Sequence, residues 1–182
     1  INLAAVSNDP IGNLFESATR AINLKATVDL ARLCHEQGVS KFILASSCSI
    51  YGDLGVKPKV ESDKTSPLTA YALSKIQSEN DIRNSLSQSN MDITFLRFAT
   101  ACGVSDRLRL DLVLNDFVAS AIKYKRIKIL SNGSPYRPLI DVKDMAKSII
   151  WAISKKHSSS EGPLSINIGS NQSNYKIIEL AK

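Results

Sequence analysis

The residues best suited to chemistry in this chain are a serine, a tyrosine and a lysine. Ser47 stands at the end of a short apolar run, residues 42–45, that has the pattern of a strand buried on both faces of a parallel sheet. Tyr71 and Lys75 are four residues apart, so their side chains share one face if the segment is helical. Ligands gather at the carboxyl ends of parallel strands, so these three groups could act together in proton transfer. The plainer alternatives are an exposed helix pair and a serine that only caps its loop.

Such a trio suits proton transfer, in which the tyrosine would act as the base. Free tyrosine titrates near pH 10, so a tyrosine base near neutrality needs a pKa lowered by roughly three units, about 4 kcal/mol. An ammonium one helical turn away, here Lys75, favours the phenolate. Ser47 could hydrogen-bond the reacting oxygen and orient it.

Longer motifs surround these residues. The strand closes with ASSCSIYG (45–52), YALSK follows at 71–75, LAAVSNDP (3–10) lies upstream and YRPLIDVKDMA (136–146) lies downstream. Taken together, these segments resemble the extended short-chain dehydrogenase/reductase family, which includes NAD-dependent epimerases and dehydratases of nucleotide sugars. The resemblance covers nearly the whole chain, whereas YxxxK alone would be a weak signal.

The pattern along the chain alternates between strand and helix, which indicates an α/β fold with a parallel sheet. We expect helices at 17–37, 68–88, 110–124 and 142–155, with Thr69 and Asp141 as N-caps, and a helix that starts near Asn174. Strands are expected at 42–45, 92–98, 128–130 and 165–169, and loops at 7–13, 53–67 and 135–138.

The resemblance implies a Rossmann-like parallel sheet with flanking helices, incomplete here, and part of a small α/β substrate domain. Residues 1–98 and 139–170 would form part of the NAD-binding domain, and residues 99–138 and 171–182 part of the substrate-binding domain. No GxGxxG or GxxGxxG turn occurs in the sequence. We therefore expect an internal portion of a longer protein that lacks the N-terminal glycine-rich portion and the C-terminal end.

By resemblance, Ser47, Tyr71 and Lys75 are the catalytic residues, and Lys75 also binds the nicotinamide ribose. The resemblance places further residues along the cofactor, which is NAD, with NADP as the alternative: Leu3, Ala4, Ala5, Asn23, Ala45, Ser46, Phe98 and Ala99. It places Thr100, Asn115 and Arg137 with Ser47 around the substrate. A guanidinium suits the diphosphate of a nucleotide sugar, and we expect that role for Arg137. Arg107 and Arg109 are interpreted as solvated surface.

The family's dehydratases carry an acidic pair where this chain has Cys48 and Ser49. Neither residue replaces a carboxylate acid or base, so dehydration is disfavoured. The leading interpretation is an epimerase that works through tyrosine-assisted hydride transfer to NAD and a keto-sugar intermediate. The alternatives are a reductase or dehydrogenase of the same family, and a non-catalytic binding module or inactive fragment.

Composition sets the remaining limits. Apolar residues make up 43% of the chain and charged residues 22%, and the net charge is +6 with scattered cations that do not indicate nucleic-acid binding. No apolar run is long enough to cross a membrane. The three cysteines are odd in number, which suggests free thiols in the cytoplasm, and no metal site is expected. By resemblance, the helices at 17–37 and 68–88 would pair across a homodimer as a four-helix bundle.

Overall fold

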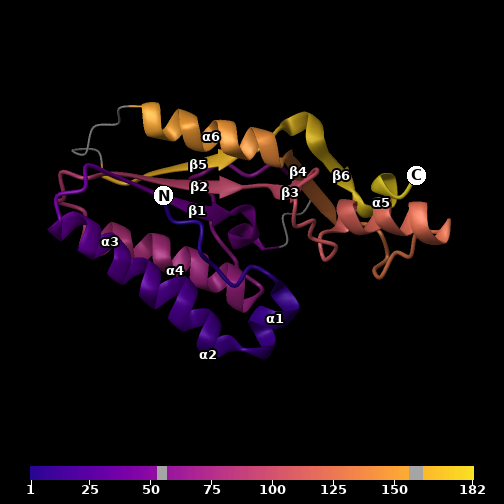
Figure 1. The fold of residues 1–182 in the computed structure, drawn as a ribbon, viewed down its shortest axis with the longest axis horizontal. Helices are drawn as coiled ribbons and strands as arrows, with labels where there is room; N and C mark the ends of the chain where they lie inside the picture. The colour runs from indigo at the N-terminus through magenta and orange to yellow at the C-terminus, as the bar shows by residue number, and fades with distance from the viewer. Residues whose placement is uncertain (53–56, 156–161) are drawn as a thin grey trace.

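The computed structural model describes residues 1–52, 57–155 and 162–182, in which a parallel sheet lies between two helical layers (Figure 1). The sheet has the order β1-β2-β5, formed by β1 (Lys41–Ser47), β2 (Asp92–Phe98) and β5 (Leu164–Ile168). Asn2 adds a parallel bridge to Leu44 on the other side of β1. The predicted α/β fold with a parallel sheet is therefore confirmed.

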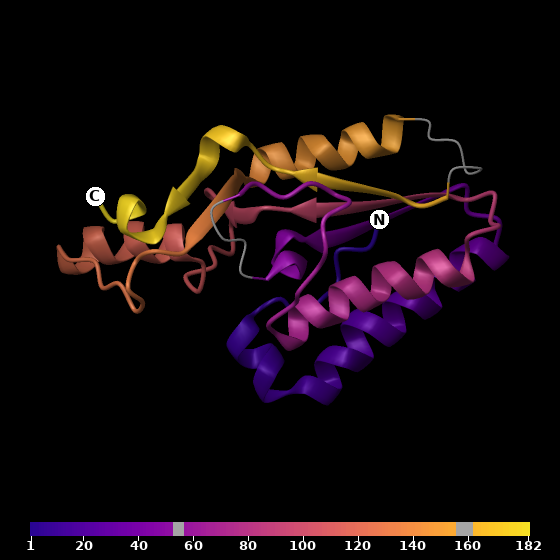
Figure 2. The ribbon, with the colours of Figure 1, turned by 180° about the vertical axis from the view of Figure 1, so that it is seen from behind.

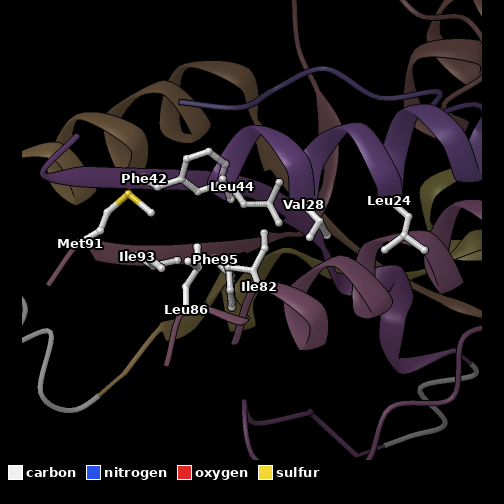
Figure 3. Packing of buried hydrophobic residues seen from close by; sticks show 10 residues of the cluster. Leu24, Val28, Phe42, Leu44, Ile82, Leu86, Met91, Ile93 and Phe95 are labelled. Carbon is white, nitrogen blue, oxygen red and sulfur yellow. The ribbon is translucent and has the colours of Figure 1, made fainter. Parts of the chain in front are cut away.

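Helices cover both faces of this sheet. Figures 1 and 2 show α3 (Ala26–Glu36) and α4 (Ala70–Ser85) on one face and α6 (Val142–Ser154) on the other. Strand side chains alternate between the faces, so Phe42 and Leu44 join the cluster under α3 and α4, whereas Ile43 joins the cluster under α6. Figure 3 shows the larger cluster, in which β1 and β2 meet the two helices.

The helix predicted at 17–37 is a continuous helical segment that contains a π-helical turn. It consists of α2 (Glu16–Thr19), a π-helical turn η1 (Arg20–Lys25) and α3, and it ends before Gly38, which has a φ of 71°. The predicted loop at 7–13 is wrong, because α1 (Asp9–Leu14) forms there. The Asn8 side chain caps this helix and a proline occupies its first turn, a favourable start that the sequence reading missed.

A smaller sheet lies at the far end of the molecule, beside α5 (Val113–Tyr124) and α7 (Ile177–Leu180) (Figure 1). β3 (Thr100–Cys102) pairs in parallel with β4 (Tyr136–Asp141), and β4 pairs antiparallel with β6 (Asn174–Lys176). The predictions of a strand at 128–130 and a loop at 135–138 are wrong, whereas the helix expected near Asn174 begins at Ile177, directly after β6. These strands are short and polar, so they depend on their pairing partners rather than on local sequence.

The strand end of β1 leads into a 3₁₀ turn, η2 (Cys48–Tyr51), and then Gly52. A side chain at Gly52 would lie 1.9 Å from the carbonyl oxygen of Ser66, and its φ is 72°. Only glycine fits this close approach. A second 3₁₀ turn, η4 (Asn171–Ser173), follows β5. The predicted loop at 53–67 includes residues 53–56, which lie outside the described part of the chain. Helix α6 and its N-cap Asp141 agree with the prediction.

No helix in the described ranges is both long enough and apolar enough to cross a bilayer.

Candidate functional site

Ser47 lies where β1 ends, and its hydroxyl is oriented by the turn that follows. It accepts hydrogen bonds from the backbone N–H of Ser49 at 3.2 Å and from the Ser49 hydroxyl at 2.9 Å. Because these bonds use the acceptor capacity of the oxygen, the Ser47 proton stays available for donation. Ser47 therefore does cap its loop, as the plainer alternative expected. The same hydrogen bonds leave its hydroxyl oriented to donate.

Tyr71 faces this hydroxyl from the first turn of α4. Burial raises the pKa of Tyr71 above its usual value, and a hydrogen bond with Ser47 opposes that rise. The charges of Asp9 and Arg109 also act on the phenol, the first raising and the second lowering its pKa. The structure thus brings the predicted serine and tyrosine together, although they are 24 residues apart in the sequence.

Lys75 is buried below Tyr71, with 2% of its surface exposed. Its Nζ donates to the carbonyl oxygen of Ala45 at 2.7 Å and lies 5.7 Å from the centre of the Tyr71 ring. Burial lowers the pKa of Lys75 from 10.5 to about 8, against the opposing charge of Glu79. An ammonium held beside a phenol in this way favours the phenolate.

The beginning of α4 is fixed by helix α1. Thr69 caps α4 by accepting from the backbone N–H of Ala72, and its hydroxyl donates to Asp9 at 2.8 Å. The Asn13 side chain accepts from the backbone N–H of Ala70 at 3.0 Å. The position of Tyr71 therefore depends on α1 as well as on its own helix.

Beneath the site lies a buried ion pair that the sequence reading did not identify. The guanidinium of Arg97 makes three hydrogen bonds to the Glu79 carboxylate, the shortest 2.7 Å, and the two side chains are 7% and 1% exposed. Ser46 donates to the same carboxylate, and Arg97 also donates to the Tyr51 hydroxyl. The only signal available in the sequence was a charged residue inside an otherwise apolar strand.

The residues predicted along the cofactor differ in how they are placed. Leu3 and Ala4 are exposed and Ala5 is half-buried, beside the strand end formed by the Asn2 bridge. Ala45 is half-buried and supplies the carbonyl that holds Lys75. These residues lie at the same edge of the sheet as Ser47 and Tyr71.

Several of the remaining predicted cofactor residues are turned inward. The Asn23 amide is fully buried and bonds both backbone groups of Val6 and the Ser74 hydroxyl, so its side chain positions the loop after the Asn2 bridge. Ser46 directs its hydroxyl to Glu79, which leaves only its backbone for a cofactor. Phe98 and Ala99 are buried, at 5% and 7% exposure.

The predicted substrate residues lie on the second sheet and its neighbours. Thr100 and Asn115 are half-buried, and the Asn115 amide donates to the backbone carbonyl of Arg109 at 3.0 Å. Arg137 is exposed and donates to a backbone carbonyl, and within the described ranges it forms no ion pair.

A cavity of about 200 Å³ adjoins this region. Cys48 and Ala99 line it, together with Tyr136 and residues 167–171, but Ser47, Tyr71 and Lys75 do not. It therefore lies next to Ser47, Tyr71 and Lys75, on the side toward β5. Burial raises the pKa of the Cys48 thiol to about 11, so this residue is a neutral wall rather than a nucleophile at neutral pH.

Arg109 was interpreted as solvated surface, and this interpretation is wrong. It forms a two-point ion pair with Asp111 and donates to both the hydroxyl and the carbonyl of Ser7. No local pattern marks it, because its partner loop is about a hundred residues away in the sequence. In the described residues, no group of three His, Cys, Asp or Glu side chains could hold a metal ion.

Comparisons with known proteins agree with this architecture. The uncharacterized UDP-glucose epimerase YtcB of Bacillus subtilis is 28% identical over 149 residues, 82% of this chain and 45% of that protein. The UDP-glucuronate 4-epimerase of Thermodesulfobacterium geofontis is 29% identical over 133 residues, 72% of this chain and 40% of that protein. The chain thus spans about half the length of the curated relatives it matches.

Solved structures show the same fold. The UDP-N-acetylglucosamine 4-epimerase of Methanobrevibacter ruminantium, in complex with UDP-N-acetylmuramic acid, superposes with a TM-score of 0.85 at 23% identity, covering 98% of this chain and 56% of that chain. The UDP-glucose 4-epimerase of Thermotoga maritima, with UDP-glucose, gives a TM-score of 0.86 at 21% identity, covering 98% and 57%. The family model described as the NAD dependent epimerase/dehydratase family matches residues 1–169, so the chain belongs to that family.

Proposed function

We propose that the complete polypeptide carrying this chain is an NAD-dependent epimerase of a nucleotide sugar. The observation that carries the proposal is the meeting of Ser47, Tyr71 and Lys75 at the carboxyl edge of the parallel sheet. The names of the relatives support the substrate class, since they are epimerases of UDP-sugars.

The residues present fit the nicotinamide side of the cofactor. Lys75 uses one donor on Ala45, and its other N–H groups have no hydrogen-bond acceptor in the described part of the chain, so they are free to bind a ribose. The exposed Ala4 and the half-buried Ala5 offer a small-residue edge along which a flat ring can lie. The choice of NAD over NADP follows the family and is part of the proposal.

In the proposed reaction, Tyr71 accepts the proton of the sugar hydroxyl and later returns it. Ser47 donates a hydrogen bond to the same oxygen, because its own acceptor sites are occupied by Ser49. Lys75 is protonated below a pH of about 8 and stabilises the phenolate that forms. NAD, held at its ribose by Lys75, would supply reversible hydride acceptance at the sugar carbon. The product is the epimer, with no net oxidation.

Arg137 is proposed to hold the diphosphate of the substrate, because it is exposed and no described carboxylate neutralises it. Thr100 and Asn115 are proposed to line the sugar pocket. Cys48 and Ser49 stand where an acid and a base would be needed to eliminate water, which argues against dehydration.

The test uses the complete polypeptide with UDP-glucose or UDP-N-acetylglucosamine as the only substrate. An epimerase converts the sugar while the absorbance of NADH stays constant. Tyr71→Phe should lose turnover and keep its circular dichroism spectrum, with the exposed Tyr124→Phe as the matched control. Turnover retained in Tyr71→Phe would remove Tyr71 as the base.

The first alternative is a reductase or dehydrogenase that uses the same residues once per turnover, and stoichiometric consumption of NADH or NADPH would reveal it. The second is a non-catalytic binding module or inactive fragment. Calorimetry with NAD separates these cases, because a module without a cofactor site would give no binding heat.

The domain boundaries and the dimer are also proposals. Residues 1–98 and 139–170 are assigned to the cofactor-binding domain, and residues 99–138 and 171–182 to the substrate-binding domain. Exposed apolar side chains on the first two long helices, among them Ile22, Leu30, Leu33 and Leu73, support a four-helix dimer interface. Light scattering of the complete polypeptide tests this, with Leu33→Glu expected to give monomers. A cytoplasmic location remains a prediction.

A further inference from the structure

The segment at 104–112 runs between β3 and α5 as a strap with little burial of its own. Val104 is 92% exposed, and Leu108 and Leu110 are 46% and 53% exposed. Apolar packing therefore does not hold the strap in place, and its position depends on polar contacts.

Those contacts come from Arg109 and Asp111. The guanidinium donates to both carboxylate oxygens of Asp111, at 3.0 and 2.5 Å, and to the Ser7 hydroxyl at 2.6 Å and the Ser7 carbonyl at 3.2 Å. The Asn8 amide donates to the same carboxylate at 2.8 Å. Both charges are about one third exposed, so the pair gains its value from five converging bonds rather than from charge alone.

The Ser7 and Asn8 loop is also the start of the support for Tyr71. Asn8 caps α1 through the backbone N–H of Ile11, and α1 holds the first turn of α4 through Asp9 and Asn13. A continuous set of hydrogen bonds thus runs from the strap through the loop and α1 to the turn that carries Tyr71.

The positive charge of Arg109 also lowers the pKa of Tyr71, and the hydrogen bonds to Ser7 and Asp111 fix where that charge lies. The charged and titratable groups that act on Tyr71 are Cys48 from η2, Asp9 from α1 and Arg109 from the strap, beside Lys75 of its own helix. Asp9 raises and Arg109 lowers the pKa of Tyr71, so Arg109 is a cation from outside α4 that favours the ionised phenol.

We propose that Arg109, clamped by Asp111 and Ser7, is a positioning residue that latches the strap to the Tyr71 support and sets its cation toward the phenol. The inference rests on the proposed function for its effect on turnover, and it assigns no contact between Arg109 and the substrate. Arg107 lies two residues away, is exposed, and makes no described contact, so it is the matched control.

The first measurement is hydrogen exchange on the complete polypeptide without substrate. Arg109→Gln should raise exchange at least several-fold in the strap, in the loop at 6–9 and in the first turn of α4, because the latch joins them. Arg107→Gln should leave all three unchanged. Equal exchange in the two variants would overturn the inference, whatever the enzyme does.

The second measurement is the pH dependence of kcat, which a purely structural role would not move. Arg109→Gln should shift the acidic limb upward by about half a pH unit, the effect of removing one partly solvated charge. Arg109→Lys should restore the limb. If Arg109→Gln alters hydrogen exchange but does not shift the acidic limb of the pH profile of kcat, the proposed effect of the Arg109 charge on Tyr71 is overturned. If the unmodified protein shows no turnover, the proposed function fails while the exchange result still decides the latch.

Discussion

Lys75 should make the folded protein more stable as the pH rises above about 8, and replacing Lys75 by methionine should remove this gain. The side chain is 2% exposed, and burial lowers its pKa from 10.5 to about 8. One pKa unit corresponds to about 1.4 kcal/mol, so keeping Lys75 charged in the folded state costs about 3 kcal/mol at neutral pH. Methionine removes this cost and also removes the bond to Ala45, worth about 1.5 kcal/mol or more. We expect Lys75→Met to be inactive and about as stable as the unmodified protein, or more stable, at pH 7.

The sign of the pH effect follows from proton counting. Between pH 8 and 10.5 the unfolded chain keeps the lysine proton and the folded chain loses it, so stability rises with pH in this window. The unmodified protein should therefore gain about 2 kcal/mol relative to Lys75→Met between pH 7 and 9.5. Taking the difference between the two proteins removes the contributions of the raised pKa values of Tyr51 and Cys48.

Urea denaturation of the complete polypeptide, followed by circular dichroism at pH 7 and 9.5, measures this difference. Lys143→Met, at an exposed position of α6, is the control and should give no pH-dependent difference. A difference between the unmodified protein and Lys75→Met that does not change from pH 7 to 9.5 would refute the burial of a charged Lys75.

Two further predictions concern stability. Gly52→Ala should lower the free energy of unfolding by more than about 2 kcal/mol, because the new carbon would lie 1.9 Å from the Ser66 carbonyl oxygen at a positive φ. Gly38→Ala, also at a positive φ but with no atom within 4 Å, is the control and should cost about 1 kcal/mol. Equal unfolding midpoints of the two variants in urea would contradict this account. Glu79→Gln should lower the free energy of unfolding by about 3–5 kcal/mol, because it leaves the Arg97 charge buried without its partner. The double variant with Arg97→Met should recover part of that loss. A strictly additive double-mutant cycle in thermal denaturation would show that the pair is not coupled.

Much of the larger sheet and the grouping of Ser47, Tyr71 and Lys75 could be predicted from the sequence. The apolar run ahead of Ser47 and the segment at 92–98 are buried on both faces, and such strands are recognisable from composition alone. Tyr71 and Lys75 share a helix, so their spacing already fixes their relation. Thr69 was recognised as the cap of that helix, and the structure confirms it.

The second sheet and the inner polar network could not be predicted. The segment at 128–130 has a strand-like composition but no described partner, and Leu130 is 87% exposed, whereas β4 forms around Pro138 because β3 and β6 pair with its two edges. Pairing with distant segments outweighs local preference in strands this short.

The sequence by itself therefore determined the order of the main elements and pointed to Ser47, Tyr71 and Lys75 as candidate site residues, because both depend on neighbours close along the chain. Only the tertiary structure decided the pKa values and hydrogen-bond partners of the polar side chains around them. The lowered pKa of Lys75, the inward turn of Asn23 and the clamp of Arg109 on Ser7 all arise from burial and hydrogen bonds between segments far apart in sequence. Such contacts have no periodicity that a sequence pattern could record.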